Sequence, residues 1–252
     1  MTTRPWVFLR GLIRQHRHWE DFPSRFESAF PGARVILLDL PGNGDLSDED
    51  SPTSLRGMVL SVRRQLRERG IAGPVNVLAI SLGAMTAIEW MHAFPGEIDR
   101  AVLMNTSLRG TSSLFERMRP SNYLPILRML ARPHTEEERE RLVLSISSNL
   151  HPRKDEVAAR WAGYAKAHPI TRANSVRQML AAARYAAPSR RPHDRVLVLR
   201  GLGDRLVNPV CSERIANRWG WELRSHPTAG HDLTLDAGEW VLGEMKRWVG
   251  EA

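Results

Sequence analysis

The stretch Val77-Leu78-Ala79-Ile80-Ser81-Leu82-Gly83-Ala84-Met85 decides the fold class of this chain of 252 residues. The apolar residues before Ser81 are typical of a buried strand, whereas those after it indicate the start of a helix. A serine on so sharp a turn needs small residues two positions before and two positions after it, and Ala79 and Gly83 meet that need. Taken alone, the pattern also fits a strand followed by a helix that a serine caps.

Short aliphatic runs alternate with helical patterns along most of the chain. The expected strands are 6–9, 34–38, 75–80, 100–104, 195–199 and 222–225, and the expected helices are 19–30, 54–69, 82–93, 209–219 and 238–249. This alternation is typical of a parallel sheet with crossover helices. We therefore expect an α/β fold of about six mostly or wholly parallel strands, flanked by helices.

The alternation stops between residues 108 and 192, where only helices are expected, at about 135–150, 155–167 and 173–185. The first of them opens with Thr135 and Glu138 at capping-box spacing. An all-helical insertion after the fourth strand is most simply a cap over the carboxyl edge of the sheet, where open α/β folds bind ligands. We expect a core domain of residues 1–107 and 193–252 and a cap of residues 108–192.

Composition excludes a wholly disordered chain, a fibrous protein and a disulfide-stabilised scaffold. The chain is 42% hydrophobic and 25% charged, as globular proteins are, and its single cysteine, Cys211, cannot form an internal disulfide. The apolar stretch 5–9 is cut by Arg10 and lacks a small-residue cleavage site, and no segment approaches the roughly 18 apolar residues of a membrane span. These features predict a cytoplasmic protein without a membrane span.

Two later strands end in loops that carry an acid and a base. The strand 195–199 leads to Gly201-Leu202-Gly203-Asp204, and the strand 222–225 leads to Ala229-Gly230-His231. Together with Ser81 they give the chain order nucleophile, acid, base, each directly after a strand. The carboxyl ends of parallel strands share one edge, so the sequence predicts a catalytic triad there.

Other roles for these and neighbouring residues stay open or are disfavoured. Taken by itself, Asp204 could also be a residue whose only role is to form a turn. Asn105, after the strand 100–104, cannot act as a carboxylate, and Asp232 is too near His231 in the chain to orient its ring. His16 and His18 lack further ligands nearby, so we predict no metal site and no cofactor.

The chain resembles the α/β-hydrolase family over nearly its whole length. Arg10-Gly11-Leu12 with Trp19 downstream resembles the family's oxyanion loop, and Asp39-Leu40-Pro41-Gly42-Asn43-Gly44 resembles its D-x-P-G-x-G turn. The chain departs from the family pattern at two positions. Arg10 replaces the usual histidine, which puts the hydrogen bonding behind the oxyanion loop in question, and Ala79 replaces the first glycine of the serine turn.

The resemblance implies acyl transfer to water. Ser81 would attack a carbonyl, His231 would take its proton, and Asp204 would orient the imidazole. The backbone N–H groups of Leu12 and Leu82 would form the oxyanion hole. Related dehalogenases and epoxide hydrolases would need an aspartate in place of Ser81.

The substrate pocket is expected to be lined by residues near the serine turn and under the cap. These residues are Arg10, Gly11, Ile80, Met85 and Trp161. A role in the core of the helical cap is the alternative for Trp161.

Charge is the feature that bears on the substrate. Residues 108–192 hold 14 arginines and 2 lysines against 7 acidic residues, a net charge of +9, within a chain of net charge +8. A basic cap suits an anionic ester, an acyl-coenzyme A or an acyl carrier protein, and the chain broadly resembles small capped esterases of the pimeloyl-[acyl-carrier protein] methyl ester esterase type. Solvated arginines in an arginine-rich proteome are the alternative. Nucleic acid is not an expected partner.

Three functions follow from these residues, in falling order. The first is a serine esterase for small or medium acyl esters. The second is a thioesterase or acyl-carrier-protein ester esterase with the same triad. The third is a lyase or a non-catalytic binding protein on the same scaffold, because a fold alone does not fix chemistry.

Overall fold

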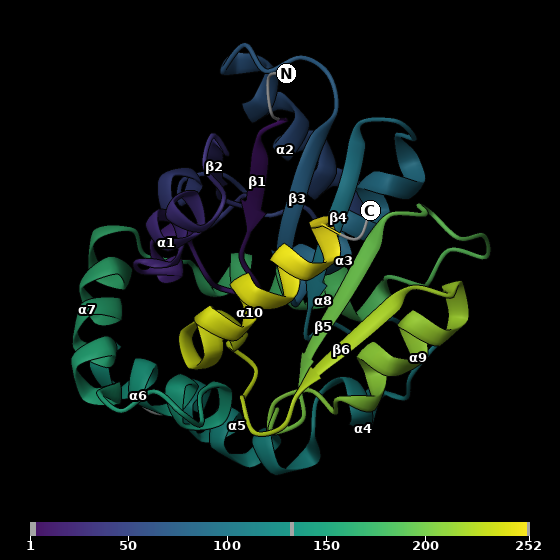
Figure 1. Ribbon diagram of the computed structural model, residues 1–252. Coiled ribbons are helices and arrows are strands. Elements are labelled where there is room, and N and C mark those ends of the chain that lie inside the picture. Colours follow the sequence, from purple (N-terminus) through teal and green to yellow (C-terminus); the bar gives the residue numbers. More distant parts are fainter. Residues whose placement is uncertain (1–3, 132–133, 251–252) are drawn as a thin grey trace.

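A single parallel sheet of six strands forms the centre of the computed structural model, which describes residues 4–131 and 134–250 (Figure 1). The strand order is β2-β1-β3-β4-β5-β6, and every neighbouring pair is parallel. The strands are β1 Trp6–Leu9, β2 Val35–Leu38, β3 Val75–Ile80, β4 Ile98–Met104, β5 Val196–Gly201 and β6 Glu222–His226. The predicted fold class is confirmed.

Helices connect the strands. They are η1 His16–Trp19, α1 Phe22–Ala29, η2 Gly44–Leu46, α2 Leu55–Glu68, α3 Leu82–Ala93, α4 Leu114–Arg117, η3 Pro120–Asn122, α5 Tyr123–Ala131, α6 Glu136–Ser147, α7 Lys154–Ala167, α8 Arg172–Arg184, α9 Val210–Trp219 and α10 Leu233–Gly250. Helix α10 begins before the expected residue 238 because a kink at Ala237 joins a short first turn to the main helix. Across the described part of the chain, no helix combines the length and the apolar character needed to cross a bilayer.

The two faces of the sheet carry separate apolar cores, because successive strand residues point to opposite sides. Val7 and Leu9 of β1 face α2, α3 and α9, whereas Trp6 and Phe8 face α1 and α10. All four of these side chains are buried. Covering both faces explains why the strands read as continuous apolar runs rather than as alternating ones.

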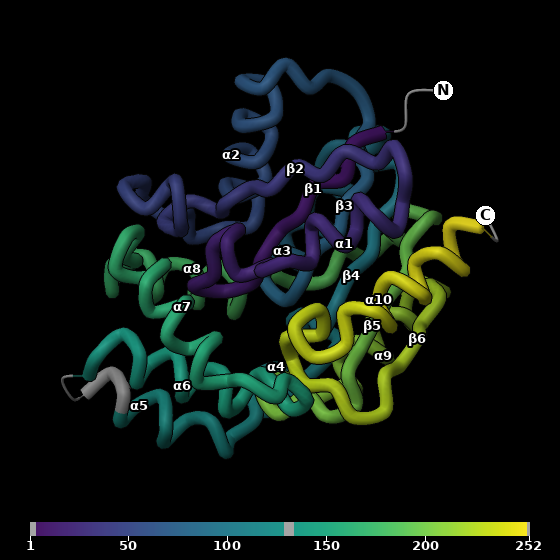
Figure 2. Tube along the Cα trace, turned by 60° about the vertical axis from the view of Figure 1, so that its left-hand side comes forward, coloured from purple at the N-terminus to yellow at the C-terminus, as the bar shows by residue number. Residues whose placement is uncertain are grey.

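Residues 108–192, the helical segment, lie between β4 and β5 and contain α4 to α8. The segment contacts loops at the carboxyl ends of the strands. The Ser148 hydroxyl donates to Asp236, and the Asn149 side chain donates to the carbonyl oxygens of Gly203 and Thr228. Figure 2 shows the segment extending beyond this end of the sheet. It therefore lies next to the edge where Ser81, Asp204 and His231 follow their strands.

Candidate active site

Ser81 occupies a strained turn between β3 and α3. Its φ of 55° and ψ of −117° lie in a region that L-residues rarely adopt, while its N–H donates to the Met104 carbonyl oxygen at 2.9 Å. A Cβ atom at Gly83 would lie only 2.4 Å from the carbonyl oxygen of Leu9. Glycine is therefore required at position 83, because α3 begins directly against the end of β1.

Asp204 and His231 form a buried pair. The Asp204 Oδ2 atom lies 2.7 Å from His231 Nδ1, and the two residues are 2% and 7% exposed. Asp204 Oδ1 accepts from the N–H groups of Leu206 and Val207 at 2.8 and 2.9 Å. Because a carboxylate only accepts hydrogen bonds, Nδ1 of His231 is the donor, and in the neutral imidazole Nε2 is then the nitrogen with the free lone pair. The aspartate thus forms a turn and also orients the imidazole.

Asn105 and Thr106, at the end of β4, connect the histidine loop to the serine turn. The Asn105 side chain donates to the carbonyl oxygens of Gly230 and His231 at 3.1 and 2.8 Å. The Thr106 hydroxyl donates to the Ser81 carbonyl oxygen at 3.0 Å. From its place in the sequence, Asn105 could be excluded as the catalytic acid but could be given no other role. An asparagine directly after a strand does suit a left-handed backbone, and the φ of Asn105 is 44°.

The loop after β1 lies against Ser81. A Cβ atom at Gly11 would lie 3.1 Å from Ser81 Cβ and 3.6 Å from its Oγ. Leu12 follows Gly11 directly, and Leu82 follows Ser81 at the amino end of α3. Within the described ranges, the hydrogen bonds include none from the backbone N–H of Leu12 or Leu82. The amino end of α3, where Leu82 lies, favours negative charge.

Arg10, which was expected to line the substrate pocket, is 4% exposed and donates two hydrogen bonds to the Asp232 carboxylate, at 3.2 and 2.5 Å. Its guanidinium also lies 4.8 Å from the centroid of the Trp19 ring. Burial is the largest single effect and raises the pKa of Asp232, but the charge and hydrogen bonds of Arg10, together with the nearby His231 and Arg14, outweigh burial and hold that pKa below its usual value.

The other expected pocket residues are also enclosed. Ile80 and Met85 are 2% and 6% exposed, and Trp161 has no exposed surface. Trp161 packs with Leu144 and Val157 in the core of the helical segment, and its Nε1 donates to Glu20. In this conformation Trp161 offers no surface to a substrate, because helix packing covers it.

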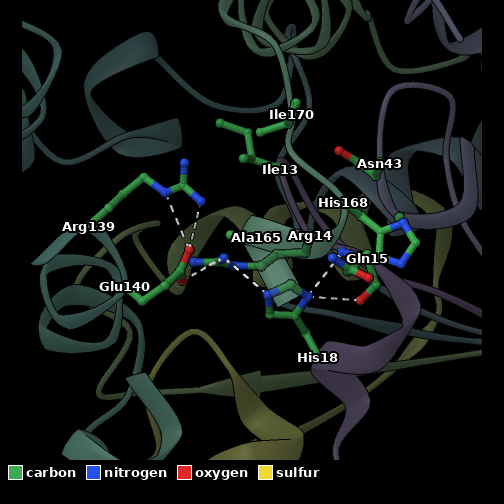
Figure 3. A pocket seen from close by; sticks show the side chains of 11 residues that line it. Ile13, Arg14, Gln15, His18, Asn43, Arg139, Glu140, Ala165, His168 and Ile170 are labelled. Carbon is green, nitrogen blue, oxygen red and sulfur yellow. Dashed lines mark hydrogen bonds and ion pairs between the residues drawn. The ribbon is translucent and has the colours of Figure 1, made fainter. Parts of the chain in front are cut away.

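Two hollows lie beside this edge. One, of about 20 Å³, lies between the loop after β1 and helices α6 and α7 and has room for about one water molecule (Figure 3). The other, of about 440 Å³, lies between η1, α7 and the start of α10. Neither is lined by Ser81, Asp204 or His231.

His16, Asp39 and Asp45 come close enough to suggest a metal site. His16 Nδ1 lies 2.8 Å from Asp39 Oδ2, and both Asp39 oxygens also accept backbone N–H groups. Asp45 forms an ion pair with Arg17 at 3.0 Å. Ion pairs and hydrogen bonds therefore account for this cluster.

Some of the basic residues of the helical segment form ion pairs within the segment. Arg139 contacts Glu136 and Glu140, and Arg141 contacts Glu137 and Asp155. Because these four acids are already counted in the net charge of +9, the pairs leave that net charge unchanged.

Comparison with known proteins agrees with this architecture. The model of the family described as the alpha/beta hydrolase family matches residues 6–244. No curated protein matches the chain.

Solved structures with the same fold include three enzymes. An enol-lactonase from Burkholderia xenovorans LB400 is 17% identical with a TM-score of 0.78, covering 98% of this chain and 92% of its own. A thermophilic esterase from Thermogutta terrifontis is 17% identical with a TM-score of 0.76, covering 99% and 90%. A meta-cleavage product hydrolase from Pseudomonas fluorescens IP01 is 18% identical with a TM-score of 0.77, covering 99% and 91%. At these identities the likeness shows the fold alone.

Proposed function

The chain belongs to the alpha/beta hydrolase family, and from that premise we propose that it is a serine hydrolase that cleaves carboxylic esters of small or medium acyl groups. The observation that carries the proposal is the buried Asp204–His231 hydrogen bond, at the sheet edge where Ser81 occupies its strained turn. Such a pair leaves Nε2 of His231 ready to accept a proton from a nucleophile.

The proposed reaction has two halves. Ser81 Oγ attacks the ester carbonyl carbon while His231 Nε2 takes the hydroxyl proton, and the imidazolium then protonates the leaving alcohol. Water, deprotonated by the same imidazole, releases the acid from the acyl-enzyme. The N–H groups of Leu12 and Leu82 bind the oxyanion of each tetrahedral intermediate, and each such donor contributes about 3–4 kcal/mol in measured cases.

The helical segment 108–192 is proposed as the cap over this site and residues 1–107 and 193–252 as the core domain. Its contacts with the loops after β5 and β6 support this division. Acyl thioesters of coenzyme A or of an acyl carrier protein are the second candidate substrates, favoured by the net charge of +9 in the segment. The single buried Cys211 suits a reducing compartment, and the cytoplasm is the proposed location.

The decisive experiment is a hydrolysis panel of p-nitrophenyl acyl esters and acyl-coenzyme A thioesters, at low and high salt. Wild type is compared with Ser81→Ala and with Ser28→Ala, a control that removes an exposed hydroxyl on α1. Loss of turnover in Ser81→Ala alone supports the proposal. A preference for thioesters that salt weakens supports the second candidate. Full turnover by Ser81→Ala, or no labelling of wild type by a fluorophosphonate, contradicts serine catalysis.

A further inference from the structure

The loop that carries Leu12 contains a strained residue. Ile13 has a φ of 59°, although its branched Cβ makes a positive φ unfavourable. Residues held in such conformations persist only where surrounding contacts fix them, and they gather at functional sites. Ile13 directly follows Leu12, the proposed oxyanion donor, so whatever fixes Ile13 also fixes the turn at Leu12.

The contact that fixes Ile13 comes from the helical segment. The N–H of Ile13 donates to Gln178 Oε1 of α8 at 2.9 Å. Gln178 has no exposed surface, and its Nε2 donates to the Pro41 carbonyl oxygen, Asn43 Oδ1 and Ser51 Oγ at 3.1–3.2 Å. Both ends of the amide are used, so the side chain is held in one orientation and the Leu12–Ile13 peptide is held with it.

The next two residues of the loop are anchored to other helices of the same segment. Arg14 forms a buried ion pair with Glu140 of α6 at 2.8 Å, and Figure 3 shows the two side chains meeting beside the small hollow. The Gln15 side chain donates to the Tyr164 carbonyl oxygen of α7 at 3.1 Å. Each of the three helices thus holds one residue of the loop, and α8 holds the one nearest to Leu12.

We propose that Gln178 is a positioning residue for the oxyanion hole. By accepting from the Ile13 N–H, it fixes the strained turn and with it the direction of the Leu12 N–H beside Ser81. The inference rests on the proposed serine-hydrolase function, since the hole has a role only if Ser81 is acylated. It also assigns the helical segment a part in catalysis besides covering the site.

The test uses a matched control one turn earlier on the same helix. Asn174 is also a buried amide, and it binds the Ser51 N–H and the Glu49 carbonyl oxygen at 2.9 and 3.0 Å without contacting the loop after β1. Gln178→Met and Asn174→Leu each remove a buried amide from α8. A purely structural role predicts similar losses of stability and similar activity in both variants.

The expected result separates the two variants. A displaced oxyanion donor weakens the transition state rather than substrate binding, so Gln178→Met should lower kcat at least ~10-fold with KM changed less than about 2-fold. Asn174→Leu should keep kcat within about 2-fold of wild type. The reaction rate of Ser81 with a fluorophosphonate should fall in parallel with kcat, and the Ile13 amide should exchange its hydrogen faster only in Gln178→Met.

Two outcomes overturn the inference in different ways. If wild type is labelled at Ser81 but Gln178→Met keeps its labelling rate, its kcat and the slow exchange at Ile13, the role of Gln178 is wrong while the serine hydrolase stands. If wild type is neither labelled nor active, the proposed function fails, and the role of Gln178 fails with it.

Discussion

Arg10 binds Asp232 through two side-chain hydrogen bonds inside the protein, although the two residues are 222 positions apart in the chain. Arg10 directly follows β1, and Asp232 directly follows His231. The pair therefore ties the loop of the proposed oxyanion hole to the loop of the proposed base. A histidine at position 10 could not form the same two parallel bonds, because only a guanidinium matches both carboxylate oxygens.

The first prediction concerns this ion pair. Arg10→Met should lower the free energy of unfolding by about 3–5 kcal/mol, because it leaves the Asp232 carboxylate buried without its partner. Urea unfolding at neutral pH measures the change. Arg25→Gln breaks the exposed pair with Glu239 and should cost less than about 1 kcal/mol. Equal losses of unfolding free energy in Arg10→Met and Arg25→Gln would contradict the prediction that the buried pair contributes more than the exposed one.

The second prediction concerns pH and His18. Burial and the neighbouring Arg14 charge hold the pKa of His18 well below its usual value in the folded protein. The unfolded state therefore binds one proton more than the folded state once the pH falls below about 6.5, and stability should fall as the pH decreases through that range.

Urea unfolding at about pH 7.5 and about pH 5.5 tests the His18 prediction, because one proton accounts for up to about 1.4 kcal/mol per pH unit. In His18→Asn the loss on acidification should be smaller than in wild type. The same dependence in both proteins would show that another group is responsible.

The third prediction uses two glycines. Gly11→Ala places a Cβ atom 3.1 Å from Ser81 Cβ, so it should displace the serine or the oxyanion loop and lower kcat/KM by ~10-fold or more. Gly163→Ala, on the exposed face of α7, meets nothing within 4 Å. It should leave kcat/KM unchanged and raise stability by up to about 1 kcal/mol. Unchanged kcat/KM in Gly11→Ala would disprove the close approach of the loop after β1 to Ser81.

The fourth prediction concerns Asn105. Asn105→Asp replaces the amide that donates to the Gly230 and His231 carbonyl oxygens with a group that repels them, so stability should fall by about 1–3 kcal/mol and kcat should fall as well. Asn76→Asp removes a donor to the Arg4 carbonyl oxygen at the opposite end of the sheet. That control should lose stability but keep kcat, as steady-state assays will show.

Most of the sheet could be predicted because its strands are continuous apolar runs. The strands at 6–9 and 75–80 have the expected bounds. Strand β4 begins at Ile98, two residues before the expected start at residue 100. The prediction left out Ile98 and Asp99 because the charged Asp99 interrupts the apolar pattern. In the structure Asp99 forms ion pairs with Arg4 and Arg195 at the rim of the sheet. Such pairing between distant segments leaves no local pattern.

The same limit applies to the site. Ser81, Asp204 and His231 could be proposed because each follows a strand in a recognisable loop. The contacts of Asn105 with the histidine loop and of Gln178 with Ile13 join segments more than 100 residues apart. Neither asparagine nor glutamine signals such a role by its neighbours in the chain. The ion pair of Arg10 could not be predicted either, because its partner, Asp232, lies near the other end of the chain.

The sheet order also determines when the site is completed during synthesis. Ser81 belongs to the half of the sheet made first, whereas β5 and β6 reach the ribosome exit only after the whole helical segment. Until then β4 has no neighbour on the side that β5 will occupy, and this open edge is exposed to other chains. A nascent chain therefore carries its proposed nucleophile long before its proposed base, His231, has emerged and β6 has joined the sheet.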